Sequence, residues 1–543
     1  MEINLFSNPV VKKHFCTAGP IVERMNYFIP SLSRIDLQDV AELILREKYF
    51  VLHAPRQTGK TSLLLSLRDY INESGNFYCV YVNIEAGQAT RNDVDKVIKG
   101  VVSSIARRAK ETLGDDYPET IADEVLSKNI TNDALTLFLS RYCQYLDKPL
   151  ILLIDEIDAI VGDSLIAILR QIRAGYDNRP KAFPQSIVLC GLRDVQDYRM
   201  NTEGQQVFAG GSPFNIKVKS LRLGDFTEAD VRNLLEQHTT ETGQRFEEDC
   251  FPLIWEYTEG QPWLVNALAY EVTYKMKENR DPSVTITADM CAKAKNRLIV
   301  SRQTHLGYLT EKLKEERIAR IIAPMLSGEP SVEEDEEERN ADIAYATDLG
   351  LVKIKPLRIA NAIYREVIPR ELTWGKQQYM MLEPLWYVNE DNSLNMQKLM
   401  TEFQQFYRQN SDWWHKDFRY IESGPQLLIQ AFLQRIINGG AYVDREYGLG
   451  SGRTDLFIRK PLTDGFGGPN QYIAIELKVR RRDSREKCIQ KGIEQTCAYI
   501  DKAGKDAEGH LLIFESDKTI PWDERIYYRK EVHNGQTIHV WGA

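Results

Sequence analysis

The sequence predicts an α/β multidomain protein with a parallel sheet in its first half and a second α/β domain at its C-terminal end. In the first half, apolar strand-like runs alternate with helical stretches, a pattern typical of a parallel sheet covered by helices. Near the C-terminus, three strand-like runs are followed by a helix and a further strand. The length of 543 residues also favours several domains, because one hydrophobic core rarely supports more than ~250–300 residues. The first-half runs are 49–53, 78–84, 150–155, 186–190 and 214–218.

Composition and charge exclude several classes of protein. Hydrophobic residues make up 43% and charged residues 27%, and no run approaches the ~20 apolar residues of a membrane span. The first residues lack the apolar segment of a secretory signal, so we expect a cytoplasmic protein with no membrane partner. Eight scattered cysteines without a C-x-x-C pair predict free thiols rather than disulfides or a zinc site. The net charge of -9 means that any phosphate binding depends on local patches.

The region between the two α/β domains reads as helical modules. Residues 317–375 read as helix, acidic loop, short helix and small hairpin, an order typical of a winged helix. The acidic run 333–338 predicts a solvated loop, and it favours a contact role for this module over DNA reading. The expected boundaries are 1–20 for an N-terminal extension, 21–222 for the first α/β domain, 223–297 for a helical lid, 298–375 for the winged-helix-like module, 376–415 for a helical linker and 416–543 for the last domain.

A phosphate-binding loop follows the first strand. The stretch FVLHAPRQTGKTSLLLSL gives a strand, the loop 54–61 and then a helix, which is the context that a P-loop needs. Backbone N–H groups of such a loop wrap phosphates, Lys60 reaches the β/γ oxygens and the Thr61 hydroxyl ligates Mg²⁺. Ala54 stands where the simplest pattern has glycine, and a chance G-K-T at a helix start is the alternative. The expected ATP contacts are Ala54, Pro55, Arg56, Gln57, Thr58, Gly59, Lys60, Thr61 and Ser62.

An acidic strand supports this interpretation of the loop. The run LILLIDEID is apolar and ends in acids, with Asp155 placed to hold the Mg²⁺ shell and Glu156 to orient the attacking water as general base. The alternative is a buried strand whose terminal acids simply face solvent. Arg193, in CGLRD after the next strand, could sense the γ-phosphate, although a surface arginine fits the pattern almost as well.

These motifs, together with TEGQPWLVNAL and IANAIYREVIP, resemble those of the AAA-like and STAND branch of P-loop ATPases over roughly residues 20–375. The resemblance implies ATP and Mg²⁺ as cofactors and a 21–222 domain that hydrolyses ATP. Gly260 and Pro262 match a lid element that lies against the nucleotide in such ATPases. Glu156, where STAND proteins often have a second Asp, indicates hydrolysis instead of a static switch.

The same resemblance implies a homo-oligomer. AAA-like ATPases commonly form rings or filaments in which an arginine of a neighbour completes the site. Arg170 and Arg173, on the helix after the acidic strand, are the candidates for this role, and the sequence does not rank them.

A charged face interrupts a strand of the C-terminal domain. In YIAIELKVRRR, Glu476 and Lys478 point away from the apolar face, because side chains of a strand alternate. Asp455 lies on the preceding strand, and an antiparallel pairing would bring it beside Glu476 with Lys478 on the same face. Two carboxylates suit Mg²⁺, and a lysine beside the metal can position or activate a nucleophile. The alternative is an edge strand with a solvated ion pair.

Asp, then Glu-x-Lys, with a helix before and after, resembles the PD-(D/E)xK nuclease superfamily over about residues 416–543, in the pattern of bacterial ATPases that carry such a domain. Thr454 stands where the family's name has proline. A cap for Glu422 and a helix surface for the Gln-Tyr pair are the alternatives. The resemblance implies Asp455, Glu476 and Lys478 as catalytic residues, Asp455, Glu476, Glu422 and the Leu477 carbonyl as metal ligands, and Gln495 and Tyr499 as a nucleic-acid element.

Three arginines follow the same strand directly. Arg480, Arg481 and Arg482 could grip backbone phosphates, or they could form a solvated turn balanced by nearby acids. Taken together, the resemblances imply an ATP-dependent or ATP-regulated nuclease that uses Mg²⁺ or Mn²⁺ and cuts DNA in preference to RNA, in antiviral defence or mobile-element biology. The alternative is a STAND-type switch whose PD-(D/E)xK domain binds nucleic acid without cleaving it.

Overall fold

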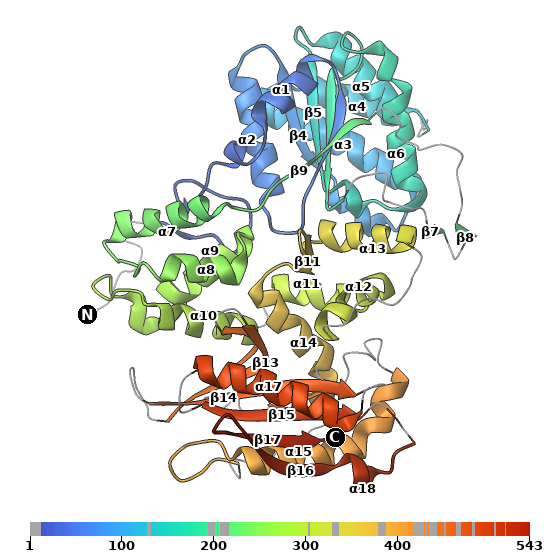
Figure 1. Ribbon diagram of the computed structural model, residues 1–543. Coiled ribbons are helices and arrows are strands. Elements are labelled where there is room, and N and C mark those ends of the chain that lie inside the picture. The colour runs from blue at the N-terminus through green and yellow to red at the C-terminus, as the bar shows by residue number, and fades with distance from the viewer. Residues whose placement is uncertain are drawn as a thin grey trace, which may run out of the picture. The chain divides into compact units, whose positions relative to one another are not determined.

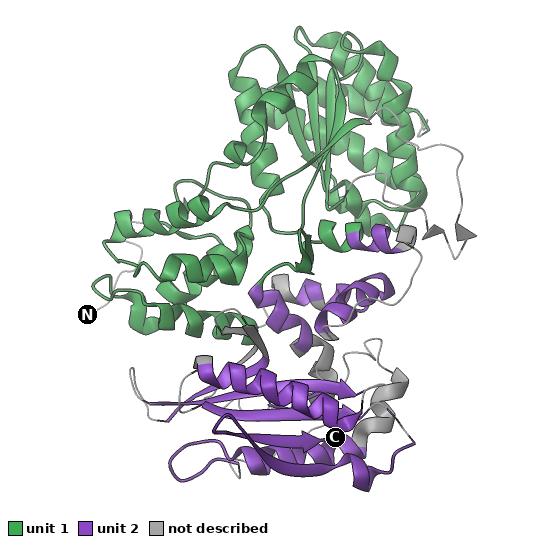
Figure 2. Cartoon of the chain, in the orientation of Figure 1, with its two compact units in different colours: residues 1–305, 344–361 green, residues 306–343, 362–543 purple. Residues whose placement is uncertain are grey.

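The chain folds into two units, each built around its own β-sheet (Figure 2). Unit 1 comprises residues 1–305 and 344–361, and unit 2 comprises 306–343 and 362–543. None of the described helices combines the length and the apolar character needed to cross a bilayer. This computed structural model describes residues 12–127, 132–193, 201–202, 205–206, 217–301, 304–327, 336–377, 387–417, 428–429, 432–433, 442–449, 452–462, 469–480, 484–503, 507–515, 517 and 519–543.

Unit 1 contains a parallel five-stranded sheet in the order β4-β5-β6-β3-β9. Each neighbouring pair runs parallel, which confirms the fold class predicted for this half. The residues of β3, β5 and β6 are buried throughout, because helices cover both faces, and this explains their unbroken apolar runs. The sequence predicts the last strand at 214–218, whereas β9 spans 217–222, and 214–216 lie outside the described residues. The strands are β3 (Tyr49–His53), β4 (Tyr78–Asn83), β5 (Leu150–Asp155), β6 (Ser186–Gly191) and β9 (Lys217–Arg222).

Two layers of helices enclose this sheet (Figure 1). Helices α1 and α2 share one apolar cluster with Phe50 and Leu52 of β3. Helices α3 to α6 share another with Tyr49 and Val51, which point to the opposite face of the same strand. The helices are α1 (Leu37–Leu45), α2 (Lys60–Glu73), α3 (Val94–Leu113), α4 (Tyr117–Ser127), α5 (Ala134–Tyr145) and α6 (Gly162–Ala174).

A helical lid follows the sheet and has its own apolar core. Phe15 and Tyr27, from the short parallel strands β1 (His14–Phe15) and β2 (Asn26–Tyr27), are part of that core, so the N-terminal segment belongs structurally to the lid. A capping box of Thr227 and Asp230 begins the first lid helix. The lid elements are α7 (Glu228–Thr242), α8 (Cys250–Thr258), α9 (Pro262–Tyr270), the π-helix η6 (Glu271–Lys275), the 3-10 helix η7 (Lys277–Arg280) and α10 (Ala288–Val300).

The region expected to be a winged helix contains helices and a two-stranded hairpin. The acidic run 333–338 is not a loop throughout, because residues 336–338 begin α13. Residues 333–335 lie outside the described ranges. The elements are α11 (Thr304–Lys312), α12 (Glu316–Ser327), α13 (Glu336–Asp348), β10 (Val352–Ile354), β11 (Leu357–Ile359) and α14 (Ala362–Gln377).

Unit 2 contains a mixed six-stranded sheet in the order β12-β13-β14-β15-β17-β16. The strands from β12 to β14 are antiparallel, β15 runs parallel to β14 and to β17, and β16 and β17 form a terminal hairpin. The first four strands confirm the predicted ones, whereas the sequence analysis missed the last two. The strands are β12 (Tyr442–Leu449), β13 (Gly452–Pro461), β14 (Asn470–Arg480), β15 (Ala507–Glu515), β16 (Tyr527–His533) and β17 (Gln536–Gly542).

Helices pack on both faces of this second sheet. Helix α17 (Arg485–Ala503) places Ile493 and Ile500 against Leu511 and Ile513 of β15. On the other face, Phe403 of α15 (Met396–Asp417) makes an edge contact with Phe514, at 6.2 Å between ring centroids. The short helix α18 (Trp522–Arg525) precedes the terminal hairpin. The helix predicted at the start of this domain falls mostly outside the described residues.

Candidate functional site

The loop between β3 and α2 has the geometry of a phosphate cradle. Gly59 adopts φ 92° and precedes Lys60, the first residue of α2. A side chain at Gly59 would be strained by this angle and would lie 3.1 Å from the Arg34 guanidinium, so the position requires glycine. The buried Lys60 ammonium donates to the carbonyls of Ala54 at 2.9 Å and Pro55 at 3.0 Å. The cation therefore lies within the loop that would wrap the phosphates.

The carboxylate of Asp155 is held in a fixed orientation at the end of β5. Its side chain is fully buried and accepts from the Thr61 hydroxyl at 2.8 Å, the Tyr81 hydroxyl at 3.0 Å and the Glu156 N–H at 3.0 Å. Thr61 and Asp155 are thus the adjacent pair that the sequence predicts for Mg²⁺. Hydroxyl and carboxylate oxygens are ligands that Mg²⁺ prefers, so this donor set fits the ion.

Glu156 has an environment that suits a general base. It adopts φ 58°, which turns the chain at the end of the strand. Burial raises the pKa of Glu156, the neighbouring Asp158 raises it further, and the Lys60 ammonium opposes the shift. Burial likewise raises the pKa of Asp158, whose carboxylate accepts from the Leu192 N–H at 3.3 Å. A carboxylate with a raised pKa accepts a proton more readily near neutral pH.

The N-terminal segment closes the site on the lid side. A cavity of about 110 Å³ is bordered by residues 16–21, by Gln57 to Gly59 of the loop and by Pro262 and Trp263 of α9. The Trp263 indole donates to the Thr17 carbonyl at 2.9 Å, and the Ile21 N–H donates to the Ser62 hydroxyl at 3.1 Å. This segment therefore contacts both the loop and the lid.

The local structure favours glycine at position 260 and proline at position 262, for different reasons. Gly260 adopts φ 76°, and a Cβ there would lie 2.0 Å from the Phe226 carbonyl oxygen. Pro262 occupies the first turn of α9, where its missing N–H leaves no hydrogen bond unmade. Together they set a tight turn against the start of the lid, and Pro262 borders the cavity next to the loop.

Arg34 joins the loop to the start of the lid. Its guanidinium donates to the Thr58 carbonyl at 2.7 Å and to the Gly224 carbonyl, and it lies 4.9 Å from the Phe226 ring centroid. Burial lowers the pKa of Arg34 to about 10, so the side chain stays charged at neutral pH.

The β10-β11 hairpin is anchored on the same side of unit 1. Glu259, with φ 47°, accepts from Lys353 at 3.0 Å and from Arg358 at 2.9 Å. Burial alone would raise the pKa of Glu259, but these hydrogen bonds outweigh it and lower the pKa. Gly350 abuts Pro55, since a Cβ on Gly350 would lie 2.8 Å from that ring. The hairpin thus contacts both the phosphate loop and the lid turn.

The arginines predicted for the nucleotide site differ in their surroundings. The Arg193 guanidinium lies 4.5 Å from the Tyr345 ring centroid, at the end of β6. Arg170 and Arg173 are both exposed on α6. Their exposure leaves both residues as candidates for a contact in trans.

In unit 2, β13 and β14 bring Asp455 and Glu476 together. The antiparallel register pairs Leu456 with Ile475, so the next position along places Asp455 opposite Glu476. The Asp455 carboxylate accepts from the Leu477 N–H at 2.8 Å. Lys478 donates to Glu476 Oε1 at 2.5 Å, and the Glu476 side chain is only 4% exposed. The three residues predicted from the sequence therefore share one face of the sheet.

The electrostatics of this cluster favour an additional positive charge. Burial raises the pKa of Glu476 to about 7, and the charge of Asp455 adds to the shift while Lys478 opposes it. Burial, followed by the charges of Glu476 and Asp455, raises the pKa of Tyr499 to about 12, so α17 faces the cluster at this residue. Glu476 Oε2 and Gln495 Oε1 are buried with no hydrogen-bond partner within the described part of the chain. Such oxygens are the groups that a metal ion or a ligand donor would satisfy.

Several predicted residues of unit 2 remain untested by this geometry. Glu422, Arg481 and Arg482 lie outside the described residues. Within the described ranges, no group of three or more His, Cys, Asp or Glu residues could hold a metal ion. Arg480 pairs with Glu515 on the neighbouring strand at 2.5 Å, which engages its guanidinium within the sheet.

A family model decides the assignment of the nucleotide-binding half. The model for the AAA-like domain matches residues 31–359, more than half of the chain. The chain belongs to this family. The match confirms the predicted resemblance of this AAA-like ATPase, whereas the STAND branch and the C-terminal nuclease resemblance stay predictions.

Several solved structures are similar to the AAA-like ATPase at low identity. The Walker-type ATPase of Pyrococcus abyssi is 15% identical with a TM-score of 0.44, covering 61% of this chain and 93% of that chain. The RuvB Holliday junction branch migration motor of Thermotoga maritima is 13% identical with a TM-score of 0.34, covering 63% and 97%. Cdc6p from Pyrobaculum aerophilum is 14% identical with a TM-score of 0.33, covering 69% and 99%. The search of curated proteins gives no match.

Three residues of the AAA-like ATPase escaped the sequence analysis. Asp158 had a readable signal, because it is the third acid of LLIDEID. Tyr81 and Arg34 had none, since each contacts a residue far away in sequence, Asp155 and Gly224 respectively. Their roles depend on how the strands and the lid pack.

Proposed function

We propose that the AAA-like ATPase uses ATP to control a metal-dependent nuclease site in unit 2, with DNA as the substrate. The observation that carries this proposal is Glu476, whose buried Oε2 has no partner in the described part of the chain while Asp455 lies opposite and Lys478 adjoins it. A buried carboxylate without a donor costs free energy unless a cation or a proton joins it. Two carboxylates and the Leu477 carbonyl are oxygen ligands that suit Mg²⁺, with Mn²⁺ as a substitute.

Each residue of the cluster has a role in the proposed cleavage. Asp455, Glu476 and the Leu477 carbonyl would hold a divalent ion, which lowers the pKa of a bound water and offsets charge on the scissile phosphate. Lys478, on the same face of β14, positions the nucleophile and stabilises the developing negative charge. Tyr499, with Gln495 one turn before it, would contact the nucleic acid from α17.

The nucleotide site supplies the control step. Backbone N–H groups of the loop and Lys60 would bind the phosphates, Thr61 and Asp155 would hold Mg²⁺, and Glu156 would take the proton of the attacking water. The hairpin pairs with the lid turn at Glu259, Gly350 just before it abuts Pro55 of the loop, and the chain continues from the hairpin into α14 of unit 2. A change of nucleotide state that moves the hairpin would therefore pull on the segment that leads to the nuclease site.

One observation favours a second candidate function. Within the described residues, only two carboxylates meet at the cluster, and Glu476 is already paired with Lys478. A PD-(D/E)xK-like domain with an incomplete metal site could bind nucleic acid without cutting it, and the ATPase would then act as a regulatory switch.

A cleavage assay separates the two functions. Plasmid, linear and single-stranded DNA and RNA transcripts are incubated with the full chain and Mg²⁺ or Mn²⁺, with and without ATP. We expect cleavage by the wild type, loss of cleavage in Lys478→Ala and Glu476→Gln, and a nucleotide response that disappears in Lys60→Ala. Lys530→Ala, an exposed lysine on β16 at the opposite end of the strand order, is the matched control and should leave cleavage intact.

The outcomes that contradict the nuclease proposal are equally specific. Cleavage that persists unchanged in Lys478→Ala and Glu476→Gln would place any nuclease activity elsewhere. Nucleotide-dependent binding with no cleavage of any substrate would support the regulatory switch.

A further inference from the structure

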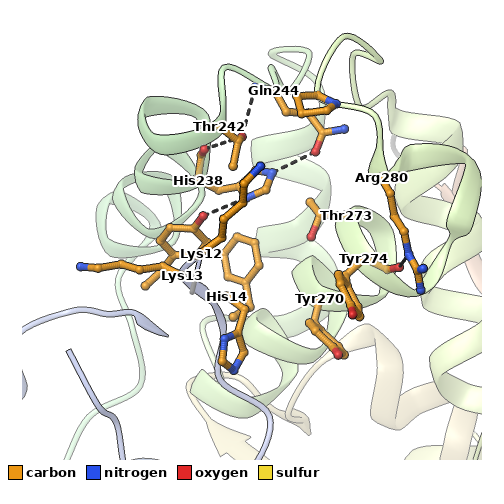
Figure 3. Close-up of a pocket in the computed structure, with 13 residues that line it drawn as sticks. Lys12, Lys13, His14, His238, Thr242, Gln244, Tyr270, Thr273, Tyr274 and Arg280 are labelled. Carbon is orange, nitrogen blue, oxygen red and sulfur yellow. Dashed lines mark hydrogen bonds between the residues drawn. The ribbon is translucent and has the colours of Figure 1, made fainter. Parts of the chain in front are cut away.

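The lid contains a second cavity that the nucleotide site does not use. It measures about 440 Å³, and Tyr27 is the one lining residue that it shares with the cavity next to the phosphate loop. Figure 3 shows its two sides: Lys12, Lys13 and His14 come from the N-terminal segment, whereas Tyr270, Tyr274 and Arg280 come from the end of α9 and the turns that follow. A cavity of this size suits a single small ligand.

One wall of the cavity is a stack of aromatic and cationic groups. The rings of Tyr270 and Tyr274 lie 5.0 Å apart at 20°, and the Arg280 guanidinium lies 4.5 Å from the Tyr274 ring centroid. The His14 ring borders the stack, 6.5 Å from that of Tyr270 and tilted by 58° to it. Tyr274 is 50% exposed although Tyr270 and Arg280 both contact its ring, so part of this wall is accessible to a further flat group. Planar bases stack on such rings irrespective of their sequence.

The stack depends on an uncommon backbone conformation. Residues 271–275 form a π-helix, in which the Met276 N–H donates to the Glu271 carbonyl at 3.0 Å. The first ring of the stack precedes this turn, and Tyr274 lies within it. π-helical turns are rare and occur frequently at functional sites, because they displace side chains from the regular helical positions. The wall therefore depends on a local backbone conformation that differs from a regular α-helix.

The rim of the cavity is positively charged. Lys12, Lys13 and Arg280 are among the lining residues, and no carboxylate is. The Lys13 ammonium lies 5.9 Å from the centroid of the Phe28 ring, which borders the other cavity. The nearby Glu241 carboxylate accepts from the backbone N–H of Lys13 at 2.9 Å. Two lysines and an arginine around one cavity attract an anion, and phosphate is the anion that arginine and lysine bind best together.

The interior polar groups are already satisfied by the protein. His238 shares a hydrogen bond with Gln244 at 2.9 Å, and the Gln244 amide donates to the Asn279 carbonyl at 2.7 Å. The Thr273 hydroxyl donates to the Ala269 carbonyl at 2.7 Å. Recognition of a ligand is thus left to the tyrosines and to the basic rim.

We propose that this cavity is a second binding site for a nucleotide unit, separate from the phosphate loop. The base stacks on Tyr270 and Tyr274, and the phosphate is bound by Lys12, Lys13 and Arg280. A base joined to a phosphate is the ligand chemistry that matches both walls. Such a unit has two sources, a free mononucleotide or one residue of a single-stranded nucleic acid.

Calorimetric titration of the full-length Lys60→Ala chain tests the proposal, because this change weakens binding at the phosphate loop. The probes are AMP, an oligothymidylate of twenty residues and inorganic phosphate. We expect AMP or the oligonucleotide to bind, and Tyr274→Ala to weaken that binding about tenfold, in line with the loss of one base-stacking contact. Replacing Lys12 and Lys13 by alanine together should weaken it and reduce its salt dependence.

A matched control separates stacking at this site from exposed tyrosines in general. Tyr145→Ala removes a 53% exposed tyrosine that stacks on Tyr117 at 4.2 Å outside the cavity, and it should leave binding unchanged. Binding of AMP identifies a free nucleotide, and binding of the oligonucleotide alone identifies a strand. The proposal is overturned if neither probe binds, if phosphate binds as well as AMP and the oligonucleotide do, or if Tyr274→Ala binds like the parent chain.

Discussion

Asp155, at the end of β5, and Glu476, within β14, are both buried acids with a lysine in the same site, yet their carboxylates have different hydrogen-bond partners. Asp155 accepts from Thr61, Tyr81 and the Glu156 N–H. Glu476 accepts from Lys478 through one oxygen, and its other oxygen has no partner in the described part of the chain. The first carboxylate is oriented by the fold alone. The second carboxylate keeps one oxygen without a hydrogen-bond donor in the described part of the chain, and burial raises its pKa.

The largest expected effect concerns the residue next to the satisfied acid. Glu156→Gln should reduce ATP hydrolysis about 100-fold or more while ATP still binds, because the general base is lost and the phosphate cradle is kept. Since burial and Asp158 raise the pKa of Glu156, the acid limb of the wild-type rate profile should lie above the range of a free glutamate. Steady-state hydrolysis across pH and nucleotide titration measure both.

The control for this prediction is Glu73→Gln, an exposed acid at the last residue of α2, at the opposite end of that helix from Lys60. It should leave the rate within about twofold of the wild type, because exposed substitutions away from a site have small effects. Equal losses in both variants would show that Glu156 acts through general charge and not as a base.

The next largest effect concerns Glu476, the acid with an unsatisfied oxygen, and the dependence of stability on pH. The pKa of Glu476 is about 7 in the folded chain against 4.5 as the ordinary value, so the folded state binds more protons between these pH values. Stability contributed by this group is therefore lost as pH rises through that window. We expect a loss of roughly 2 kcal/mol between about pH 5 and pH 8, which Glu476→Gln removes.

Urea unfolding at the two pH values, followed by tryptophan fluorescence, measures this difference. Adding Mg²⁺ at the higher pH should restore stability to the wild type and leave Glu476→Gln unaffected, because a bound cation replaces the missing proton. If the two proteins lose stability equally, with or without the ion, Glu476 is not the strained group.

A smaller effect tests how firmly Asp155 is held. Tyr81→Phe removes one of its three donors and should lower stability by about 1 kcal/mol, with a several-fold fall in hydrolysis. Tyr78→Phe is the matched control, since it removes a hydroxyl on the same strand that donates to the exposed Asp147 at 2.9 Å. Thermal melting and hydrolysis rates of the pair give the difference, and identical behaviour would show that two donors suffice.

The smallest effect concerns a third acid, Glu259, which is satisfied but reachable by solvent. Its side chain is 22% exposed and pairs with Lys353 and Arg358. Glu259→Gln should lower stability by only about 0.5 kcal/mol, because partly exposed ion pairs contribute little. A double-mutant cycle with Lys353→Met measures the coupling. A coupling several times larger would mean that this hairpin contact behaves like a buried pair.

Local sequence patterns were sufficient for the parts of the molecule that depend on strand periodicity. The apolar runs predicted the first sheet, and the alternation around Glu476 together with the position of Asp455 predicted their meeting across β13 and β14. The terminal hairpin was missed although Asn534 and Gly535, both with positive φ, are the typical residues of its turn. The sequence therefore contained a turn signal for this hairpin, and the prediction did not use it.

Other features could not be read from the sequence because they arise from contacts between distant segments. Phe15 and Tyr27 lie in the lid core, which is formed more than 200 positions later, and no local pattern marks them as lid residues. The donor role of Tyr81 likewise requires β4 to lie beside β5. The acidic run at 333–338 was predicted to be a loop because of its charge, and the start of the helix at 336 was therefore missed.

Arg34 gives the nucleotide site a mechanical constraint. One guanidinium donates both to the Thr58 carbonyl of the loop and to the Gly224 carbonyl at the base of the lid. A large movement of the lid would therefore either move the loop as well or leave a buried cation without its acceptors. Movement of the lid is thereby coupled to movement of the phosphate loop. A lysine at this position has one ammonium in place of the forked guanidinium, so it would couple the two movements less tightly.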